Sequence, residues 1–368
     1  MSVERLEIRN FRNLQSVSLE ISTSVNVFVG DNGSGKTSLL ETLNILSTAK
    51  SFRNTPLNDL INTSSNNFTV SASLRNKDGS LYKVGVGKRS GKLVTARVNG
   101  ESVKKVSELA ERLPVIVVEP SSVVLIEGGP SERRQYLDMG LFHVEHDFLR
   151  VWKSFNKTLK QRNALLKLGN NSSIKEELKV WDKEFCTAAK SLDLYRRDII
   201  ERITPLFNTL VNDLEIDAGI DIQYQPGWDS SYALEEILEK NRTRELRYGV
   251  TIFGPHKAEI QFKTGQNSSK DFLSRGQKKL LTYALRVSLA DLISKSGYHN
   301  CTPLLLLDDL TSELDLQFCR LLCKVLNKRS NLQVFITAIK NDRFLEVIED
   351  ELSPMMFHVE HGQISQRL

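Results

Sequence analysis

Two short segments, separated by most of the chain, restrict what this sequence can fold into. Residues 30–37 read G-D-N-G-S-G-K-T, which fits the phosphate-loop pattern G-x-x-x-x-G-K-[ST]. Residues 304–309 read L-L-L-L-D-D, an apolar run that ends in two carboxylates. The first segment is typical of a loop that holds a nucleoside triphosphate, and the second of a strand end that positions magnesium and water. The long stretch between them indicates a large insertion into a nucleotide-binding core.

The residues around the glycine loop support a phosphate site. An apolar strand is expected at residues 25–29 and a helix from Ser38 onward, which is the context that such a loop requires. Backbone N–H groups of the loop would point at phosphate oxygens, and the dipole of the helix would add to the attraction. We expect Lys36 to reach the β- and γ-phosphates and Thr37 to ligate Mg²⁺. The expected nucleotide-binding residues are Gly30, Asp31, Asn32, Gly33, Ser34, Gly35, Lys36, Thr37 and Ser38.

The acidic pair is expected to supply the chemistry. An all-apolar strand at residues 304–307 belongs at the centre of a parallel sheet. Two carboxylates directly after it need a cation to face, because buried charges need partners. We expect Asp308 to hold Mg²⁺, directly or through water, and Asp309 to orient or deprotonate the attacking water, so Lys36 and Asp309 are the expected catalytic residues. A strand that simply ends at the surface is the alternative, which the upstream loop disfavours.

A third motif, L-S-R-G-Q-K at residues 273–278, predicts a site shared between two molecules. It opens a helix expected to run from Gln277 to about Ser294. A helix N-terminus that begins with a hydroxyl and a glycine is a second anion site. One phosphate chain cannot easily use two such sites from one protomer, so the second should complete a partner's site. The residues expected there are Ser274, Arg275, Gly276 and Gln277, with Ser312 and Asp315 at the same interface.

The rest of the chain predicts an α/β ATPase head with a strand-rich lobe and an inserted helical arm. Residues 3–29 and 68–118 read as strands, with hairpin turns at Asp78-Gly79 and Asn99-Gly100, and strands return around residues 250–253 and 259–262. Between them, residues 148–166 and 178–199 carry facing apolar stripes, which predict an antiparallel helical hairpin about 30 Å long. Pro205 should end or kink the second helix. We therefore expect a head at residues 1–144 plus 245–368 and an arm at residues 145–244.

The distribution of charge indicates a polyanion partner. The net charge is only +5, but residues 75–105 hold nine basic side chains against two acidic ones. Residues 148–168 hold six basic side chains and no acidic one. Either run could be an ordinary solvated face, and two in one chain make a polyanion partner worth considering. On the first helix of the arm the cations lie along one stripe, so we expect DNA contacts from Arg150, Lys153, Lys157 and Lys160, or from the basic lobe at residues 75–105.

Composition points to a cytoplasmic protein without a membrane partner. No apolar run approaches the roughly 20 residues that a membrane span needs, and the N-terminus lacks the layout of a signal peptide. The four cysteines show neither C-x-x-C spacing nor pairing with histidine, so we expect buried, reduced thiols.

Together, the glycine loop, the L-S-R-G-Q signature, the L-L-L-L-D-D strand and the S-E-L-D segment after it resemble the head of the ABC/SMC ATPases. Finer marks resemble the RecF family within that group: N-F-R-N at residues 10–13, G-G-P-S-E-R-R at 128–134, G-P-H-K at 254–257 and M-F-H-V-E-H-G at 356–362. The resemblance covers essentially the whole chain. It implies DNA replication and recombinational repair, ATP-driven homodimerisation of the heads on double-stranded, gapped or junction DNA, release by hydrolysis, and the mediator RecR as a partner that helps to load recombinase.

Three departures from the wider superfamily favour a slow DNA-dependent ATPase used as a timed clamp over a rapid motor. The second acidic residue is Asp309, where the superfamily usually has the longer glutamate. The glutamine of the Q-loop is replaced by the stretch V-E-P-S at residues 118–121, and the switch histidine by T-A-I at residues 337–339.

Other classes of protein fit less well. The ATP-binding subunit of a transporter would need a coupling glutamine and a membrane partner, and a purely structural SMC-like protein would need hundreds of coiled-coil residues. A small-molecule P-loop kinase would lack the signature motif. A GTPase is disfavoured because N-K-D at residues 76–78 is one residue short of the base-reading motif N-K-x-D.

Overall fold

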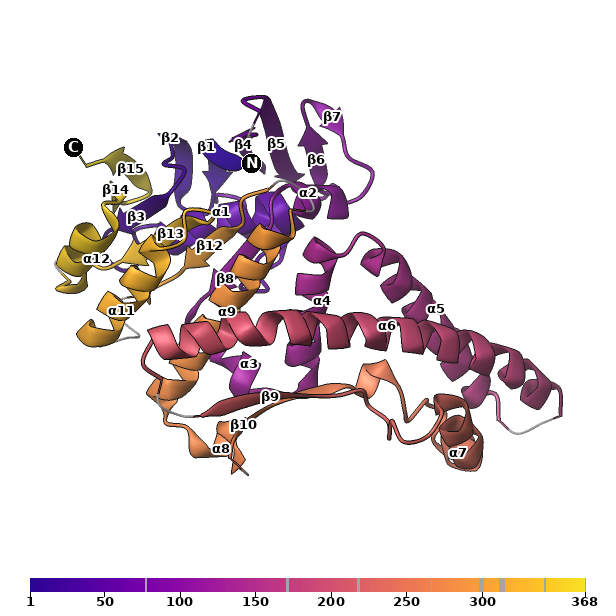
Figure 1. The fold of residues 1–368 in the computed structure, drawn as a ribbon. Coiled ribbons are helices and arrows are strands. Elements are labelled where there is room, and N and C mark those ends of the chain that lie inside the picture. Colours follow the sequence, from indigo (N-terminus) through magenta and orange to yellow (C-terminus); the bar gives the residue numbers. More distant parts are fainter. Residues whose placement is uncertain are drawn as a thin grey trace. The chain divides into compact units, whose positions relative to one another are not determined.

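The computed structural model describes residues 1–76, 78–169, 172–216, 219–265, 267–297, 301–310, 315–340 and 342–367 (Figure 1). Its contacts form two compact units. The first comprises residues 1–122, 209–216 and 279–368, and the second comprises residues 123–208 and 217–278. The division into a head and an arm with boundaries at residues 144 and 245 stays a prediction.

The central sheet of the first unit is built mainly from parallel strands. Its order is β15-β14-β3-β13-β12-β8, and only β15 runs antiparallel to its neighbour. Every side chain of β12 is fully buried, which confirms the all-apolar strand predicted at residues 304–307. Three phenylalanines from adjacent strands stack through the core, with centroid distances of 4.8 Å (Phe28–Phe357) and 6.5 Å (Phe28–Phe335). The strands are β3 (Val25–Val29), β8 (Val115–Val118), β12 (Leu304–Leu307), β13 (Gln333–Ala338), β14 (Met355–Glu360) and β15 (Gln363–Gln366).

A second, antiparallel sheet forms the strand-rich lobe of the same unit, in the order β2-β1-β4-β5-β6-β7. Buried and exposed residues alternate along its strands, as expected for a sheet that packs on the core with one face. Both predicted hairpin turns are confirmed, and Asn99 (φ 50°) and Gly100 (φ 86°) have the positive φ values of a tight two-residue turn. The strands are β1 (Ser2–Phe11), β2 (Leu14–Glu20), β4 (Asn67–Arg75), β5 (Leu81–Arg89), β6 (Thr95–Val98) and β7 (Glu101–Ser102).

Helix α1 (Lys36–Thr48) lies between the two sheets, since it contacts β1, β4 and β5 on one side and β8 and β13 on the other. The fully buried amide of Gln333 also joins the sheets. It accepts a hydrogen bond from the N–H of Val3 (2.9 Å) and donates to the carbonyls of Val3 (2.7 Å) and Ser22 (2.8 Å). The remaining helices of this unit are η1 (Leu57–Leu60), α2 (Ser107–Arg112), η2 (Pro120–Val123), most of α9 (Arg275–Ser296), α11 (Leu316–Asn327) and α12 (Phe344–Leu352).

The second unit contains the predicted helical hairpin, formed by α5 (Phe148–Lys167) and all but the last residues of α6 (Ser172–Asp213). The facing stripes meet in a contact between Phe155 and Phe185, with ring centroids 5.6 Å apart. The helix does not end at Pro205 but continues to Asp213, so that alternative of the prediction is wrong. The other elements are α3 (Val124–Glu127), α4 (Pro130–Val144), β9 (Ile220–Gln225), α7 (Leu234–Tyr248), η3 (Pro255–Lys257), β10 (Glu259–Thr264), β11 (Asn267–Ser268) and α8 (Ser269–Phe272).

The strand predicted at residues 250–253 is wrong, whereas the one at residues 259–262 is confirmed as part of β10. Side chains of neighbouring helices accept hydrogen bonds from the backbone N–H groups that a β-sheet would use. The N–H of Thr251 donates to the side chain of Asn163 (2.7 Å), and the N–H of Ile252 donates to Glu245 (2.8 Å). Such competition from side chains holds the segment in an irregular conformation.

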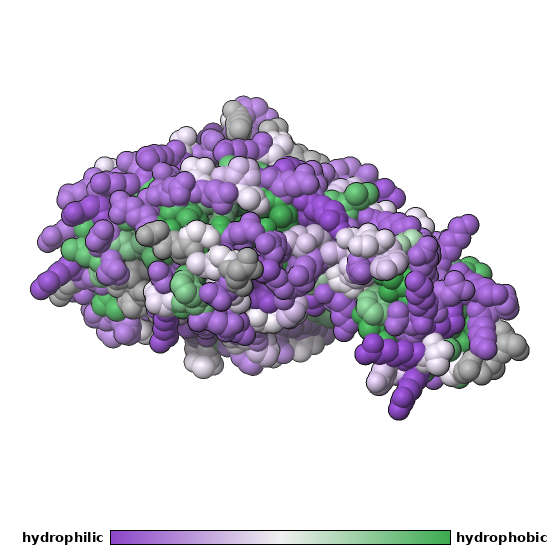
Figure 2. Space-filling model, turned by 60° about the horizontal axis from the view of Figure 1, so that its bottom comes forward, coloured by the Kyte–Doolittle hydropathy of each residue, from purple (hydrophilic) through white to green (hydrophobic). Residues whose placement is uncertain are grey.

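None of the described helices is long and apolar enough to cross a membrane, and the face drawn in Figure 2 is covered mostly by hydrophilic residues with scattered apolar patches. The four cysteines are free thiols. Cys186, Cys319 and Cys323 are buried, as predicted, but Cys301 is partly exposed.

A buried ionic network holds the helices of the second unit together. Arg162 is fully buried and donates to Glu245 (2.5 Å), Asp182 (2.7 Å) and the hydroxyl of Thr251 (2.8 Å). Arg242 donates to the second oxygen of Asp182 (2.5 Å). Because α5, α6 and α7 all contribute, the network fixes how these helices pack.

We predict that Arg162→Ala lowers the free energy of unfolding of the second unit by about 3–5 kcal/mol, since it leaves buried carboxylates without their cation. The control is Lys179→Ala, which removes an exposed partner of Glu176 on α6. This variant should change the free energy of unfolding by no more than about 0.5 kcal/mol. All three tryptophans (Trp152, Trp181 and Trp228) belong to this unit, so urea unfolding followed by tryptophan fluorescence reports on it. Equal unfolding midpoints for the two variants would contradict the role of the network.

Candidate functional site

The structure brings the glycine loop and the acidic pair together in one cavity of about 520 Å³ in the first unit. The hydroxyl of Thr37, at the start of α1, donates a hydrogen bond to Asp308 Oδ1 (2.9 Å) at the end of β12. The cavity is lined by Asn32, Gly33, Gly35, Lys36, Thr37, Ser38, Arg53, Glu119, Pro120, Ser121, Asp308, Asp309 and Thr337.

Glycines are required in the loop for two different reasons. Gly33 (φ 80°) and Gly35 (φ 121°) adopt backbone conformations that other residues rarely tolerate. At Gly30, by contrast, a Cβ atom would lie 2.1 Å from the carbonyl oxygen of Val359. The loop therefore depends on its own backbone geometry and on close packing against β14.

Lys36 is held inside the loop. Its Nζ donates to the carbonyls of Gly30 (2.7 Å) and Asp31 (2.9 Å). Burial lowers the pKa of Lys36, and the nearby carboxylates of Asp309, Asp308 and Asp31 oppose that shift. The ammonium thus lies among carboxylates and carbonyls, at the position from which a P-loop lysine contacts phosphates.

Thr337 connects the two acidic residues. It is fully buried, and its hydroxyl donates to Asp308 Oδ1 (2.8 Å) while it accepts from the backbone N–H of Asp309 (2.7 Å). Asp309 has a positive φ of 55°, a left-handed conformation that aspartate tolerates better than most residues. In the sequence Thr337 stands out only as the residue that replaces a switch histidine, whereas in the structure it sets the geometry of the acidic pair.

The oxygen ligands around Asp308 fit Mg²⁺. Burial raises the pKa of the Asp308 carboxyl, and the hydroxyls of Thr337 and Thr37 partly oppose that shift. A buried carboxylate of this kind gains from a nearby divalent cation, and carboxylate and hydroxyl oxygens are the ligands that Mg²⁺ takes in nucleotide sites. The roles of Thr37 and Asp308 as magnesium ligands remain predictions.

Two charged residues of the cavity were missed by the sequence analysis as site residues. Arg53 follows α1 in an irregular segment, and no motif marks it. Glu119 lies in the stretch that replaces the Q-loop glutamine, but the sequence did not predict that its carboxylate lines the cavity. Burial raises the pKa of Glu119 and the Asp308 carboxylate adds to the shift, whereas the Ser121 hydroxyl, Arg53 and Arg286 lower it. The cavity thus holds a third carboxylate and a second cation.

Residues from both ends of the chain support the loop. The side chain of Asn13 donates to the carbonyl of Ser34 (3.0 Å), and the N–H of Gly362 donates to the same carbonyl (2.9 Å). Next to Asn13, Arg12 forms a pair with Glu41 of α1 (2.6 Å), which is fully buried. The N-F-R-N and H-V-E-H-G motifs therefore position the phosphate loop from outside.

The predicted signature residues lie in the second unit, at the start of α9. Ser274 and Gln277 form a reciprocal capping box, in which the N–H of Ser274 donates to Gln277 Oε1 (3.0 Å) and the N–H of Gln277 donates to Ser274 Oγ (3.2 Å). Ser274, Arg275 and Gly276 are exposed. The N–H groups of the first turn that have no partner within the helix can donate hydrogen bonds to an anion.

The other predicted residues are placed as follows. Asp315 caps α11 by accepting a hydrogen bond from the N–H of Phe318 (2.8 Å), and Ser312 lies outside the described residues. Arg150, Lys153, Lys157 and Lys160 are exposed on α5, and Arg150 pairs with Asp147 (3.2 Å). Their expected DNA contacts stay a prediction.

Two of the sequence motifs that resemble the RecF family, at residues 128–134 and 254–257, have structural roles in the second unit. Arg133 of the G-G-P-S-E-R-R segment binds Glu259 through two hydrogen bonds (2.7 and 2.8 Å), and Arg134 donates to the carbonyl of Ala258 (2.9 Å) beside the G-P-H-K turn. Gly254 of that turn has a φ of 136°. Both marks thus fasten α4 to β10 and the turn before it.

Comparisons with known proteins agree with this geometry. The sequence matches the RecF/RecN/SMC N-terminal domain family over residues 2–365. It is 38% identical over 367 residues to the DNA replication and repair protein RecF of Pseudomonas entomophila strain L48, covering 100% of this chain and 98% of the relative. The RecF of Stutzerimonas stutzeri strain A1501 is 39% identical with the same coverage. The chain belongs to the RecF family. Its curated relatives are named as proteins of DNA replication and repair.

Solved structures show the same fold. Two are described as the recombination mediator protein RecF in the RecFOR pathway, one with ATP (TM-score 0.84, 26% identity) and one with ATPrS (TM-score 0.83, 25% identity). Each match covers 100% of this chain and 98% of that one. An SMC head bound to a winged-helix domain of ScpA (TM-score 0.60, 16% identity, covering 100% of this chain and 97% of that one) shares the fold alone. The predicted α/β fold of an ABC/SMC-type ATPase head is therefore confirmed.

We predict that Gly362→Ala weakens ATP binding although it lies outside the glycine loop. Gly362 has a φ of 79°, and a Cβ atom there would lie 2.1 Å from the carbonyl oxygen of Asn13. Asn13 would have to move, and the phosphate loop that its side chain supports would move with it. Gly79→Ala is a matched control, because Gly79 has a φ of 84° and open space around it. Titration with a fluorescent ATP analogue should show at least a tenfold loss for Gly362→Ala and less than a twofold loss for Gly79→Ala. Equal affinities would contradict the supporting role of this turn.

Proposed function

We propose that this protein is an ATP-dependent DNA-binding clamp of recombinational repair and replication-fork maintenance, whose two copies close on DNA when ATP is bound and separate after slow hydrolysis. The observation that carries the proposal is the hydrogen bond from Thr37 to Asp308, which joins a phosphate loop to an acidic strand end in one cavity. A phosphate loop next to an acidic strand end is the arrangement that binds a nucleoside triphosphate and hydrolyses it.

Within the cavity, each residue type has a task that fits its position. Lys36 and the N–H groups at the start of α1 bind the β- and γ-phosphates. Thr37 and Asp308 would hold Mg²⁺, which neutralises phosphate charge when bound. Asp309 orients the attacking water and accepts its proton. The shorter side chain of Asp309 reaches less far than a glutamate, and this is consistent with slow hydrolysis.

The exposed start of α9 supports closure between two copies. Ser274 and the free N–H groups beside it are available to an anion from outside the protomer. The γ-phosphate held by the Lys36 of a second copy is such an anion. ATP then joins two molecules, because each ligand is bound by the loop of one copy and the signature of the other.

The relatives supply the biological setting of the proposal. They are named as DNA replication and repair proteins, and related structures are described as a recombination mediator with ATP. We infer DNA, in double-stranded, gapped or junction form, as the macromolecular ligand. The mediator RecR is the proposed protein partner, and assisted loading of recombinase is the proposed outcome.

The proposal predicts that Ser274→Arg blocks ATP-induced dimerisation without weakening ATP binding to the monomer, because the larger side chain fills the space that the partner's phosphate must enter. Ser230→Arg places the same side chain on an exposed serine away from the signature and should behave as the wild type does. Light scattering gives the mass, and a fluorescent ATP analogue gives the affinity.

A mixture of Ser274→Arg with Lys36→Ala should recover part of the dimer. One heterodimer site then combines the intact loop of the first variant with the intact signature of the second. An ATP-dependent dimer of Ser274→Arg alone, with wild-type turnover, would show that the signature does not act on a partner's ATP.

A further inference from the structure

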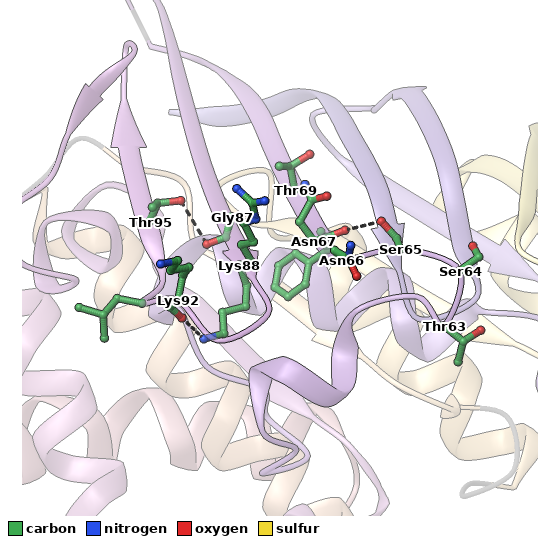
Figure 3. A pocket seen from close by; sticks show the side chains of 13 residues that line it. Thr63, Ser64, Ser65, Asn66, Asn67, Thr69, Gly87, Lys88, Lys92 and Thr95 are labelled. Carbon is green, nitrogen blue, oxygen red and sulfur yellow. Dashed lines mark hydrogen bonds between the residues drawn. The ribbon is translucent and has the colours of Figure 1, made fainter.

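A polar groove of about 890 Å³ opens on the strand-rich lobe, between the segments 63–69 and 87–95 (Figure 3). The groove lies within the first unit and shares no lining residue with the phosphate cavity. Three of its lining residues are cations, namely Lys88, Arg89 and Lys92, and none of the described lining residues carries a carboxylate.

The sequence of β5 accounts for the floor of the groove. Val84 and Val86 face the core and are buried, so Gly85 and Gly87 alternate with them on the opposite face. Gly87 is the cross-strand neighbour of both Thr69 on β4 and Thr95 on β6. The Thr95 hydroxyl donates to the carbonyl of Gly87 (3.2 Å) and lies 3.1 Å from the position that a Cβ atom of Gly87 would occupy, so backbone and threonine side chains form the floor of the groove.

Lys88 and Arg89 end β5 and Lys92 lies in the loop that follows, and this hairpin is well anchored. The N–H of Ser90 donates to the carbonyl of Asn66 (2.9 Å), and the N–H of Lys92 donates to the carbonyl of Arg89 (3.0 Å). Lys88 alternates with Gly87 along β5, so its side chain leaves the other face of the strand and donates to the carbonyl of Lys92, as the dashed line in Figure 3 shows. The loop therefore presents its positive charge without first having to be ordered.

The charge of this loop is not neutralised within the lobe. Elsewhere on the same sheet, Arg5 pairs with Glu7 and Glu20, Lys83 with Glu7, and Arg75 with Glu4. Those pairs lie toward the other end of the strands, about 20 Å from Arg89 at the usual rise per residue.

In contrast, the structure shows no ion pair between Lys88, Arg89 or Lys92 and a described carboxylate. Arg9, the exposed cross-strand neighbour of Thr69, adds a fourth cation beside the groove and likewise has no ion pair with a described carboxylate.

We propose that this groove binds the sugar–phosphate backbone of DNA, an inference that rests on the proposed function and assigns its DNA contacts to the lobe. Phosphate contacts come from arginine and lysine together with serine, threonine and asparagine side chains, and this is the mixture that lines the groove. Binding would be independent of base sequence and sensitive to salt. The stripe on α5 is the weaker candidate, because it belongs to a single helix and its Arg150 is already paired with Asp147.

The test compares two triple variants that lose the same charge. Lys88→Gln/Arg89→Gln/Lys92→Gln removes the cations of the groove, and Lys153→Gln/Lys157→Gln/Lys160→Gln removes those of α5. The affinity for a gapped duplex is measured with ATP over a range of salt concentrations. Each lost phosphate contact lowers the salt slope by about 0.9, so the groove variant should lose about 2–3 units of slope and at least tenfold in affinity at low salt. The α5 variant should retain the wild-type slope and lie within twofold of the wild-type affinity.

A pair of single variants tests the site without removing the loop's charges. Thr69→Glu places a carboxylate at the floor of the groove, and Ser73→Glu places one on the same strand and face, beside the paired residue Lys83. Only Thr69→Glu should weaken DNA binding, and ATP binding should be unchanged in all variants because the phosphate cavity is separate.

Wild-type DNA affinity and salt slope in both groove variants would overturn the assignment to the lobe while leaving the proposed function intact. A loss confined to the α5 variant would do the same. Failure of the wild-type protein to bind DNA with ATP would instead overturn the proposed function itself.

Discussion

The buried carboxylate of Asp308 is the point on which the functional core depends. It accepts hydrogen bonds from Thr37 and Thr337, which lie 271 and 29 residues away in the sequence. A buried carboxylate is costly without partners, so these bonds hold the start of α1 and the ends of β12 and β13 at one point. The parallel sheet makes this possible, because β3, β12 and β13 all present their carboxyl ends at the same edge.

The same edge explains why the two ends of the chain are part of the site. β14 pairs in parallel with β3, so the turn after β14 returns Gly362 to the phosphate loop. The turn between β1 and β2 brings Asn13 to the same loop, and the pair of Arg12 with the buried Glu41 fixes that turn on α1. A loop supported from both sides is preorganised for phosphate, and this reduces the ordering that binding would otherwise require.

Much of this could be predicted from the sequence, because the signals are local. The glycine loop, the all-apolar strand at residues 304–307 and the facing stripes of the helical arm each follow from spacing within one element. The rest depends on contacts that spacing does not encode. Residues 250–253 have the composition of a strand, but Asn163 and Glu245 take their backbone donors. Arg53 enters the cavity from a segment without a motif, and Glu119 acquires its raised pKa only through burial and the proximity of Asp308.

The proposed function depends most on ATP joining two copies of the protein. Analytical ultracentrifugation of Asp309→Asn, which keeps the proposed magnesium ligands but removes the proposed proton acceptor for water, tests it most directly. Asparagine tolerates the left-handed backbone found at Asp309, so the fold should be retained. We predict a persistent dimer of twice the 41.7 kDa chain mass with ATP, and monomers with ADP or without nucleotide. A protein that binds ATP but sediments as a monomer under all three conditions would contradict the account.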